Sequence, residues 1–135
     1  MLEKSMNRIE VATLYVGLNI LILLTLIVLV IIQRQKHKCA IGDGGHTSLM
    51  LAIRAHANAI EVIPVTLVGF VALASIGASA PTIHILGATL TAGRVLHAYG
   101  LSRSGGTSFG RMSGMLLSLA AMAGTAIMCL RAALM

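Results

Sequence analysis

A cation, an amide and a carboxylate recur at helical spacing within an apolar stretch of this chain. Arg54, Asn58 and Glu61 stand at positions i, i+4 and i+7, so on a helix their side chains fall within an arc of about 60°. A charged side chain at the centre of a membrane helix costs roughly 2.5 to 3.5 kcal/mol, and such residues usually face a polar cavity or a partner. Because Pro64 has no N–H to give the carbonyl of Ile60, a kink is expected beside them. Arg54, Asn58 and Glu61, called the polar stripe below, are therefore a candidate binding site.

Three further polar residues are candidates for the same site. Arg94 and His97 end a later apolar run and lie within about 60° of each other on a helix. Arg111 begins the last apolar run, where its charge adds to the positive end of a helix dipole and favours an anion. The residues alone leave two alternatives open. Arg94 either binds a ligand or neutralises Glu61, and the charges of the polar stripe either form a site or pair within the protein and set helix register.

Composition places the chain among small membrane proteins. Of its 135 residues, 57% are apolar and 10% are charged, far from the balance of a soluble domain. Four apolar runs, at about 9–32, 49–76, 81–99 and 112–130, each reach the roughly 17 to 25 residues that a membrane helix needs. We therefore predict a single all-α domain, an integral membrane four-helix bundle in contact with the lipid bilayer, in which the first run is a permanent span.

The basic residues indicate how the chain crosses the membrane. The net charge of +6 comes from residues at the ends of the apolar runs, which argues against a nucleic-acid-binding patch. Two loops hold Arg34, Lys36, Lys38, Arg103 and Arg111, and the opposite side holds Lys4, Arg8 and Arg131. By the positive-inside rule the two loops are cytoplasmic, so both termini are expected on the non-cytoplasmic side.

Smaller patterns concern packing. Gly110, Gly114 and Ser118 recur every four residues, a ridge of small side chains that permits close helix approach within or between subunits. His84 stands alone near the start of a run and is interpreted as a hydrogen-bonded packing residue. Residues 41–46 contain three glycines and an aspartate, which predicts a tight turn.

Metal and nucleotide chemistry have no support in the sequence. The histidines are scattered, no Cys-x-x-Cys occurs, and no metal is predicted. Neither a Walker pattern nor Gly-x-Gly-x-x-Gly is present. Cys39 and Cys129 are expected about a membrane thickness apart, so they cannot form a disulfide with each other.

The pattern Arg54-x3-Asn58-x2-Glu61-x2-Pro64 on the second of four spans, with Arg94 and His97 ending the third, resembles the MAPEG family. This is the group of membrane-associated proteins in eicosanoid and glutathione metabolism. The resemblance covers nearly the whole chain in length, span order and loop polarity. It implies a homotrimer of four-helix subunits that bind glutathione, as co-substrate, at subunit interfaces open to the cytosol.

The resemblance also implies roles for the candidate residues. The polar stripe is expected to contact the tripeptide, Arg94 and His97 correspond to a patch on helix three, and Arg111 falls near the arginine that holds the glutathione thiolate. Glutathione has two carboxylates, an ammonium and a thiol, so its site needs guanidinium groups, one carboxylate and a cation that lowers the thiol pKa. Arg54, Glu61 and Arg111 match that need.

At two positions this chain differs from some members of the family. Those members have a second tyrosine on helix three where this chain has Leu101, or a tyrosine where it has Val62. The sequence looks closest to the bacterial branch, which implies a multi-pass protein of a bacterial inner membrane. The leading hypothesis is a membrane-embedded glutathione-binding protein, a glutathione transferase or peroxidase for hydrophobic small-molecule electrophiles. The alternatives are a small proton-coupled multidrug transporter that uses Glu61, and a non-catalytic membrane scaffold.

Overall fold

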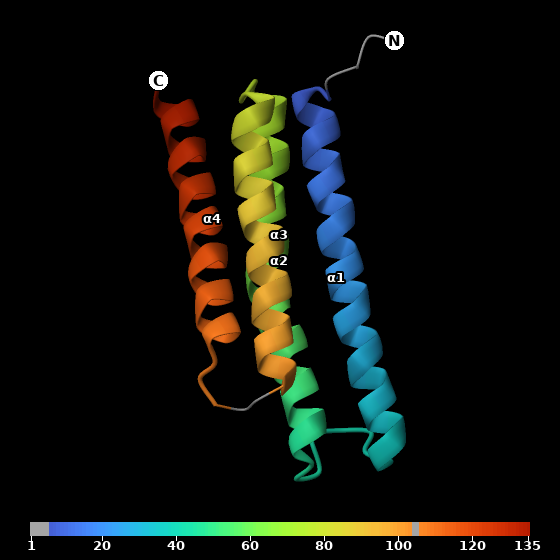
Figure 1. Cartoon of the computed structure of the whole chain (residues 1–135). Coiled ribbons are helices and arrows are strands. Elements are labelled where there is room, and N and C mark those ends of the chain that lie inside the picture. Colours follow the sequence, from blue (N-terminus) through green and yellow to red (C-terminus); the bar gives the residue numbers. More distant parts are fainter. Residues whose placement is uncertain (1–5, 104–105) are drawn as a thin grey trace, which may run out of the picture.

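The computed structural model describes residues 6–103 and 106–135, and this part of the chain contains four helices and no strand. They are α1 (Arg8–His37), α2 (Thr47–Ser75), α3 (Ala80–Arg103) and α4 (Phe109–Leu134). The helices run up and down side by side, so both termini lie at one end and the α1–α2 and α3–α4 loops at the other (Figure 1). The all-α prediction is confirmed.

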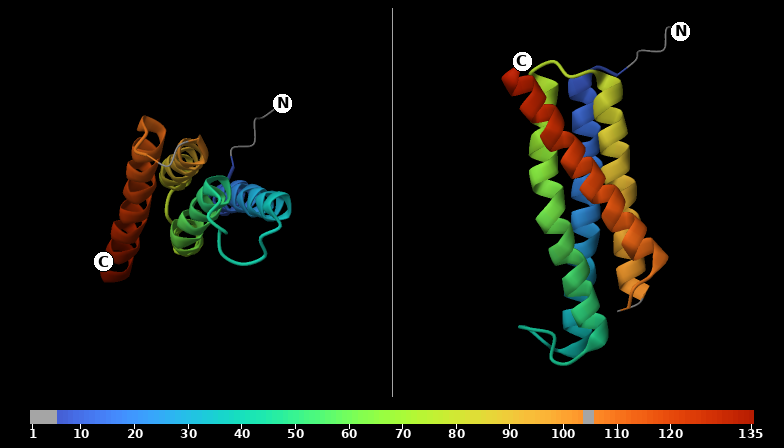
Figure 2. Two further views of the ribbon diagram at one scale, coloured as in Figure 1. Left: turned by 90° about the horizontal axis from the view of Figure 1, so that it is seen from below. Right: turned by 90° about the vertical axis from the view of Figure 1, so that its left-hand side faces the viewer.

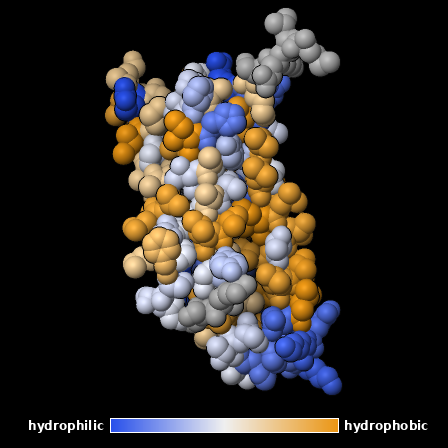
Figure 3. All heavy atoms as spheres, in the orientation of Figure 1, coloured by the Kyte–Doolittle hydropathy of each residue, from blue (hydrophilic) through white to orange (hydrophobic). Residues whose placement is uncertain are grey.

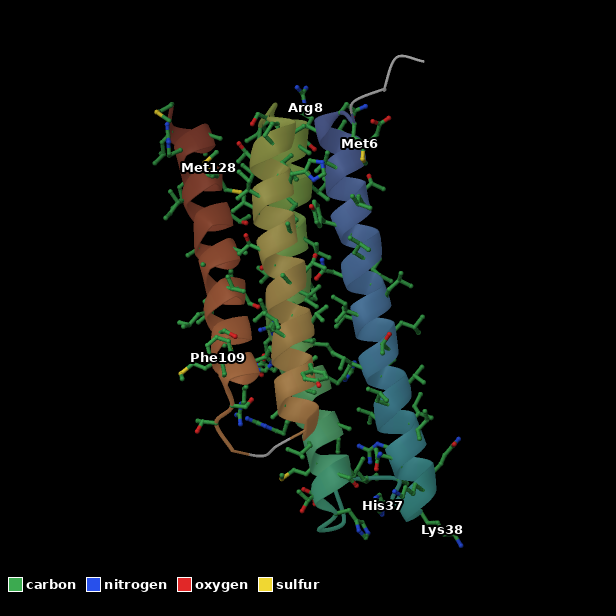
Figure 4. All side chains as sticks on the ribbon, viewed as in Figure 1. Met6, Arg8, His37, Lys38, Phe109 and Met128 are labelled. Carbon is green, nitrogen blue, oxygen red and sulfur yellow. The ribbon has the colours of Figure 1, made fainter. Side chains whose placement is uncertain are left out.

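Local sequence explains where α1 begins and ends. The side chain of Asn7 accepts hydrogen bonds from the backbone N–H groups of Ile9 and Glu10, and Glu10 in turn accepts from the N–H of Asn7. This capping box satisfies N–H groups that have no partner inside the helix. The helix ends at His37, and the residue after it, Lys38, adopts the left-handed conformation, φ 52°. Arg8 and the pair His37 and Lys38 therefore lie at opposite ends of the bundle (Figure 4).

Among the described residues, α1, α2 and α4 are long and apolar enough to cross a membrane. The prediction of four spans differs at α3, which does not meet that measure although it has 24 residues. Its Arg94 and His97 lower its average apolarity, but both side chains are buried against other helices, 1% and 3% exposed. α3 runs alongside the other helices (Figure 1) and does not show these polar groups to the exterior.

Apolar side chains cover most of the visible surface between the two ends, and hydrophilic side chains gather at the loop end of α1 (Figure 3). Large apolar residues such as Leu21, Leu24, Val68 and Leu116 are more than half exposed. A water-soluble protein seldom exposes so continuous an apolar surface. The chain is therefore a multi-pass integral membrane protein.

The ridge of small residues on α4 packs within the chain, against α3. A Cβ atom added to Gly93 of α3 would lie 2.9 Å from the carbonyl oxygen of Gly114 and 2.6 Å from Oγ of Ser118. A Cβ atom on Gly114 would collide with the backbone N of His97. Glycines at both positions thus allow the closest helix contact in this part of the bundle, while α4 crosses the other helices obliquely (Figure 2).

Buried polar side chains connect α1 to α3. The side-chain amide of Asn19 donates hydrogen bonds to the carbonyl of Tyr15 and to Oγ1 of Thr91, both at 2.9 Å. The hydroxyl of Tyr15 lies 3.0 Å from Nδ1 of His84, with the two rings edge to face. The interpretation of His84 as a hydrogen-bonded packing residue is confirmed.

The turn predicted at residues 41–46 is present. Gly42, Gly44 and Gly45 have φ angles of 70°, 57° and 77°, which glycine adopts without steric cost. Oδ1 of Asp43 accepts a hydrogen bond from the N–H of Gly45 at 2.9 Å. Beyond this turn α2 begins and continues without interruption past Pro64.

Candidate functional site

The polar stripe occupies one side of α2, in the half of the helix nearest the α1–α2 loop. Arg54 and Glu61 are exposed and Asn58 is half-buried. Among the described residues, neither Arg54 nor Glu61 forms an ion pair or a side-chain hydrogen bond. The alternative in which these charges pair within one chain is therefore not realised. Opposite charges stand on a membrane helix and point away from the subunit.

Arg94 lies behind the stripe and is almost completely buried, 1% exposed. Its Nε donates a hydrogen bond to Oγ of Ser118 at 2.7 Å, and its Nη1 donates to Oδ1 of Asn58 at 2.8 Å. Its Nη2 has no hydrogen-bond partner among the residues that the structure describes. Arg94 does not pair with Glu61 in the described part of the chain, so the alternative in which it neutralises Glu61 is not seen there. The guanidinium instead joins α3 to α2 and α4.

His97 and Arg111 line a second part of the candidate site. They share a cavity of about 520 Å³ with Ser108, Met112, Met115 and Leu116, near the loop between α3 and α4. His97 is 3% exposed, and Nη1 of Arg111 donates to the carbonyl of Gly106 at 3.3 Å. The lining of the cavity thus includes a cation and an imidazole as well as thioether and leucine side chains.

The structure thus brings the predicted residues together in two groups. Asn58 contacts Arg94, and Arg94 stands one helical turn before His97 on α3, so α3 connects the polar stripe to the cavity of Arg111. Both groups lie toward the loop end of the bundle.

Ser118 also belongs to the candidate site, although the sequence indicated it only as a small packing residue. Its spacing from Gly114 predicts close packing, but the use of its hydroxyl by Arg94 depends on tertiary structure.

Residues 106–110 have the spacing Gly-x-Ser-x-Gly that hydrolases use for a nucleophilic serine. In that motif the serine stands on a sharp turn between a strand and a helix. Ser108 instead follows a helix-to-helix loop and caps α4, where its Oγ accepts a hydrogen bond from the backbone N–H of Arg111 at 3.2 Å. The serine is therefore a helix cap.

The fold and the site together define a class of protein. It is a multi-pass membrane protein of four up-and-down helices that has a polar stripe on the second helix. The chain belongs to the MAPEG family, whose sequence model matches residues 12–131. It is 40% identical over 90 residues to the inner membrane protein YecN of Escherichia coli strain K12, an alignment that covers 67% of this chain and 69% of that protein. YecN of Escherichia coli O6:H1, strain CFT073, matches to the same extent. No solved structure matches the chain.

Proposed function

We propose that this protein binds glutathione through the polar stripe and conjugates it to hydrophobic electrophiles. The observation that carries the proposal is the exposure of Arg54 and Glu61 on an apolar membrane helix, where neither side chain has a partner among the described residues. Charges in that position are costly unless a polar ligand or a neighbouring subunit covers them. A zwitterionic ligand has a partner for each charge. Its carboxylate pairs with the guanidinium of Arg54, and its ammonium pairs with the carboxylate of Glu61.

The same exposure supports a homotrimer as the working unit. A stripe that points away from its own subunit forms an enclosed site only when a second copy covers it. The small-residue ridge of α4 is already occupied by α3, as the close approach of Gly93 to Gly114 and Ser118 indicates. The surface left for neighbouring subunits therefore includes the polar stripe, which supports a glutathione site between subunits.

Arg111 is the proposed catalytic residue. A guanidinium near a thiol favours the thiolate, which is the nucleophilic form. The thiolate sulfur attacks the electrophilic carbon of the substrate, a sulfur–carbon bond forms, and a halide or comparable group leaves with its bonding pair. The thiol proton is released to water. Met112, Met115 and Leu116, which line the same cavity, offer an apolar wall for the hydrophobic substrate.

The proposed location is a bacterial inner membrane, as the name of the relative in Escherichia coli suggests. The loops after α1 and α3 would face the cytoplasm, because the basic residues concentrate there. The candidate site would then open toward cytosolic glutathione, with both termini on the far side.

The test is turnover by purified protein with glutathione and 1-chloro-2,4-dinitrobenzene, followed by absorbance, together with glutathione binding by calorimetry. Arg54→Ala and Glu61→Ala should each weaken binding by about tenfold or more, because each leaves a charge of the ligand unpaired. Arg131→Ala is the matched control, since Arg131 is an exposed cation at the opposite end of α4. Unchanged binding in both stripe variants, with no turnover, would refute the proposal.

Two further assays distinguish the remaining functions. A hydroperoxide offered in place of the aryl halide tests peroxidase activity. Drug-driven proton flux in vesicles that disappears in Glu61→Gln, without turnover, would favour a proton-coupled transporter. Intact assembly with neither activity would favour a scaffold.

A further inference from the structure

Arg94 holds the side chain of Asn58 from behind. The distance from Nη1 of Arg94 to Oδ1 of Asn58 is 2.8 Å, and the same nitrogen lies 3.4 Å from the backbone carbonyl oxygen of Asn58. The other side of the guanidinium is fixed by Ser118, which is completely buried and receives a hydrogen bond from Nε at 2.7 Å. Ser118 in turn donates to the carbonyl of Gly114 at 2.7 Å. The guanidinium is therefore fixed between two helices.

This contact determines which way the Asn58 amide faces. A guanidinium has only hydrogen-bond donors, so the amide atom that it meets must be the oxygen. Without such a neighbour, the side-chain amide of an asparagine can exchange the positions of its oxygen and nitrogen at little cost. The assignment of the two atoms is then ambiguous. Here Oδ1 is engaged by Arg94, and among the described residues Nδ2 of Asn58 has no hydrogen-bond partner. Two N–H donors thus remain, on a half-buried residue between Arg54 and Glu61 in the polar stripe.

We propose that Arg94 is a positioning residue that makes Asn58 a hydrogen-bond donor to a carboxylate or carbonyl oxygen of the bound ligand. Arg94 does not touch the ligand in this arrangement. The inference rests on the proposed glutathione site and deepens it, because it assigns the group of the tripeptide that Asn58 contacts. It also predicts that ligands with an acceptor oxygen at this point bind better than ligands with a donor.

Because Arg94 is charged, one substitution at Asn58 should change stability and ligand binding in opposite directions. Within the described ranges the hydrogen-bond partners of Arg94 are the neutral oxygens of Asn58 and Ser118, and Nη2 has none. A buried cation without an anion is unfavourable. Asn58→Asp keeps an acceptor for Arg94 and adds the missing negative charge, but it removes the two donors. Stability should therefore rise while ligand binding falls.

The experiment compares full-length wild type with Asn58→Asp in detergent. Without ligand, Asn58→Asp should raise the Tm by about 5 °C, a shift typical of one improved buried interaction. Its affinity for glutathione, measured by calorimetry, should fall by at least tenfold, because the aspartate has no donor and repels the ligand carboxylates. A role confined to packing would move stability and binding together. Glutathione affinity within twofold of wild type would overturn the proposal, and so would an unchanged or lower Tm.

Asn19→Asp is the matched control for the change in stability. Asn19 is also a buried amide on a membrane helix, but its hydrogen bonds in the described part of the chain go to Tyr15 and Thr91 and not to a cation. Its replacement by aspartate should lower the Tm. Absence of glutathione binding by wild type would refute the proposed function and the donor role of Asn58 with it. A raised Tm in Asn58→Asp would then still support the hold of Arg94 on Asn58, so the two failures are distinguishable.

Discussion

The imidazole rings of His37 and His46 stack with their centroids 4.1 Å apart and their planes at 17°, across the loop that joins α1 to α2. Nε2 of His37 also lies 2.9 Å from Oγ of Ser48 in the first turn of α2. Both rings lie beyond the predicted span 9–32. Incomplete hydration of the ring lowers the pKa of His37, and the neighbouring charges of His46 and Lys36 lower it further.

This shift predicts an acid-sensitive loop. With a folded-state pKa below the usual value of about 6.5, His37 binds protons more weakly in the folded protein than in the unfolded one. Its contribution to stability is therefore complete above about pH 6.5 and decreases as the pH falls from there to the folded pKa. Hydrogen exchange of residues 39–46 should be faster at pH 5 than at pH 7.5, after correction for intrinsic exchange rates. His37→Gln should reduce that difference, and an equal difference in the variant would contradict the prediction.

Gly114 should tolerate no larger residue. Because a Cβ atom at this position would collide with the backbone of His97 and lie 2.6 Å from the carbonyl oxygen of Gly93, Gly114→Ala must separate α3 from α4. We expect a loss of about 1 to 3 kcal/mol in the free energy of unfolding, measured in detergent. Gly17→Ala is the control, since a Cβ atom there meets nothing within 4 Å. Alanine at Gly17 should leave stability unchanged or raise it slightly, because alanine favours helix more than glycine does.

Ser118→Ala should destabilise the bundle through Arg94. The variant removes the acceptor of Nε and leaves a second buried guanidinium nitrogen without a partner, at a cost of about 1 to 3 kcal/mol. Thr125→Ala is the matched control, because Thr125 is also a buried hydroxyl on α4 but its one hydrogen bond among the described residues goes to the carbonyl of Ala121 in its own helix. A smaller loss is expected there. Equal losses in the two variants would show that the contact with Arg94 adds no stability.

The sequence predicted the elements and the stripe because both follow from local periodicity. The apolar runs correspond to the four helices, and the i, i+4, i+7 spacing places Arg54, Asn58 and Glu61 along one helix. It did not predict the partners of Arg94, since Asn58 and Ser118 lie 36 and 24 residues away along the chain. Contacts of that separation depend on how α2 and α4 pack against α3. From the sequence, Arg94 was expected either to bind a ligand or to neutralise Glu61. In the structure it instead donates hydrogen bonds to Asn58 and Ser118.

Arg34 should control the order of the α1–α2 loop. Its Nη1 approaches the carbonyl oxygens of Cys39, Ala40 and Gly42 at 3.3, 3.1 and 2.9 Å. Arg34→Ala leaves these carbonyls without that donor, and a loss of about 1.4 kcal/mol would make loop opening about tenfold more frequent. The rate at which a thiol reagent modifies Cys39 should rise accordingly. Lys36→Ala removes a cation from the same helical turn and should leave the rate unchanged. A similar rise in both variants would assign the effect to charge alone.

The same thiol can establish which side of the membrane the loop faces. The excess of basic residues predicts a cytoplasmic α1–α2 loop, so a membrane-impermeant maleimide should modify Cys39 in inverted vesicles and not in intact spheroplasts. Cys129 needs a separate control, because it lies near the opposite end of the bundle, half-buried against Gly69. In a Cys129→Ser background all labelling reports on Cys39, and the Cys39→Ser background reports on the other face. Modification of Cys39 in spheroplasts alone would reverse the proposed topology. It would also place the candidate site away from cytosolic glutathione, so this experiment tests a requirement of the proposed function without measuring activity.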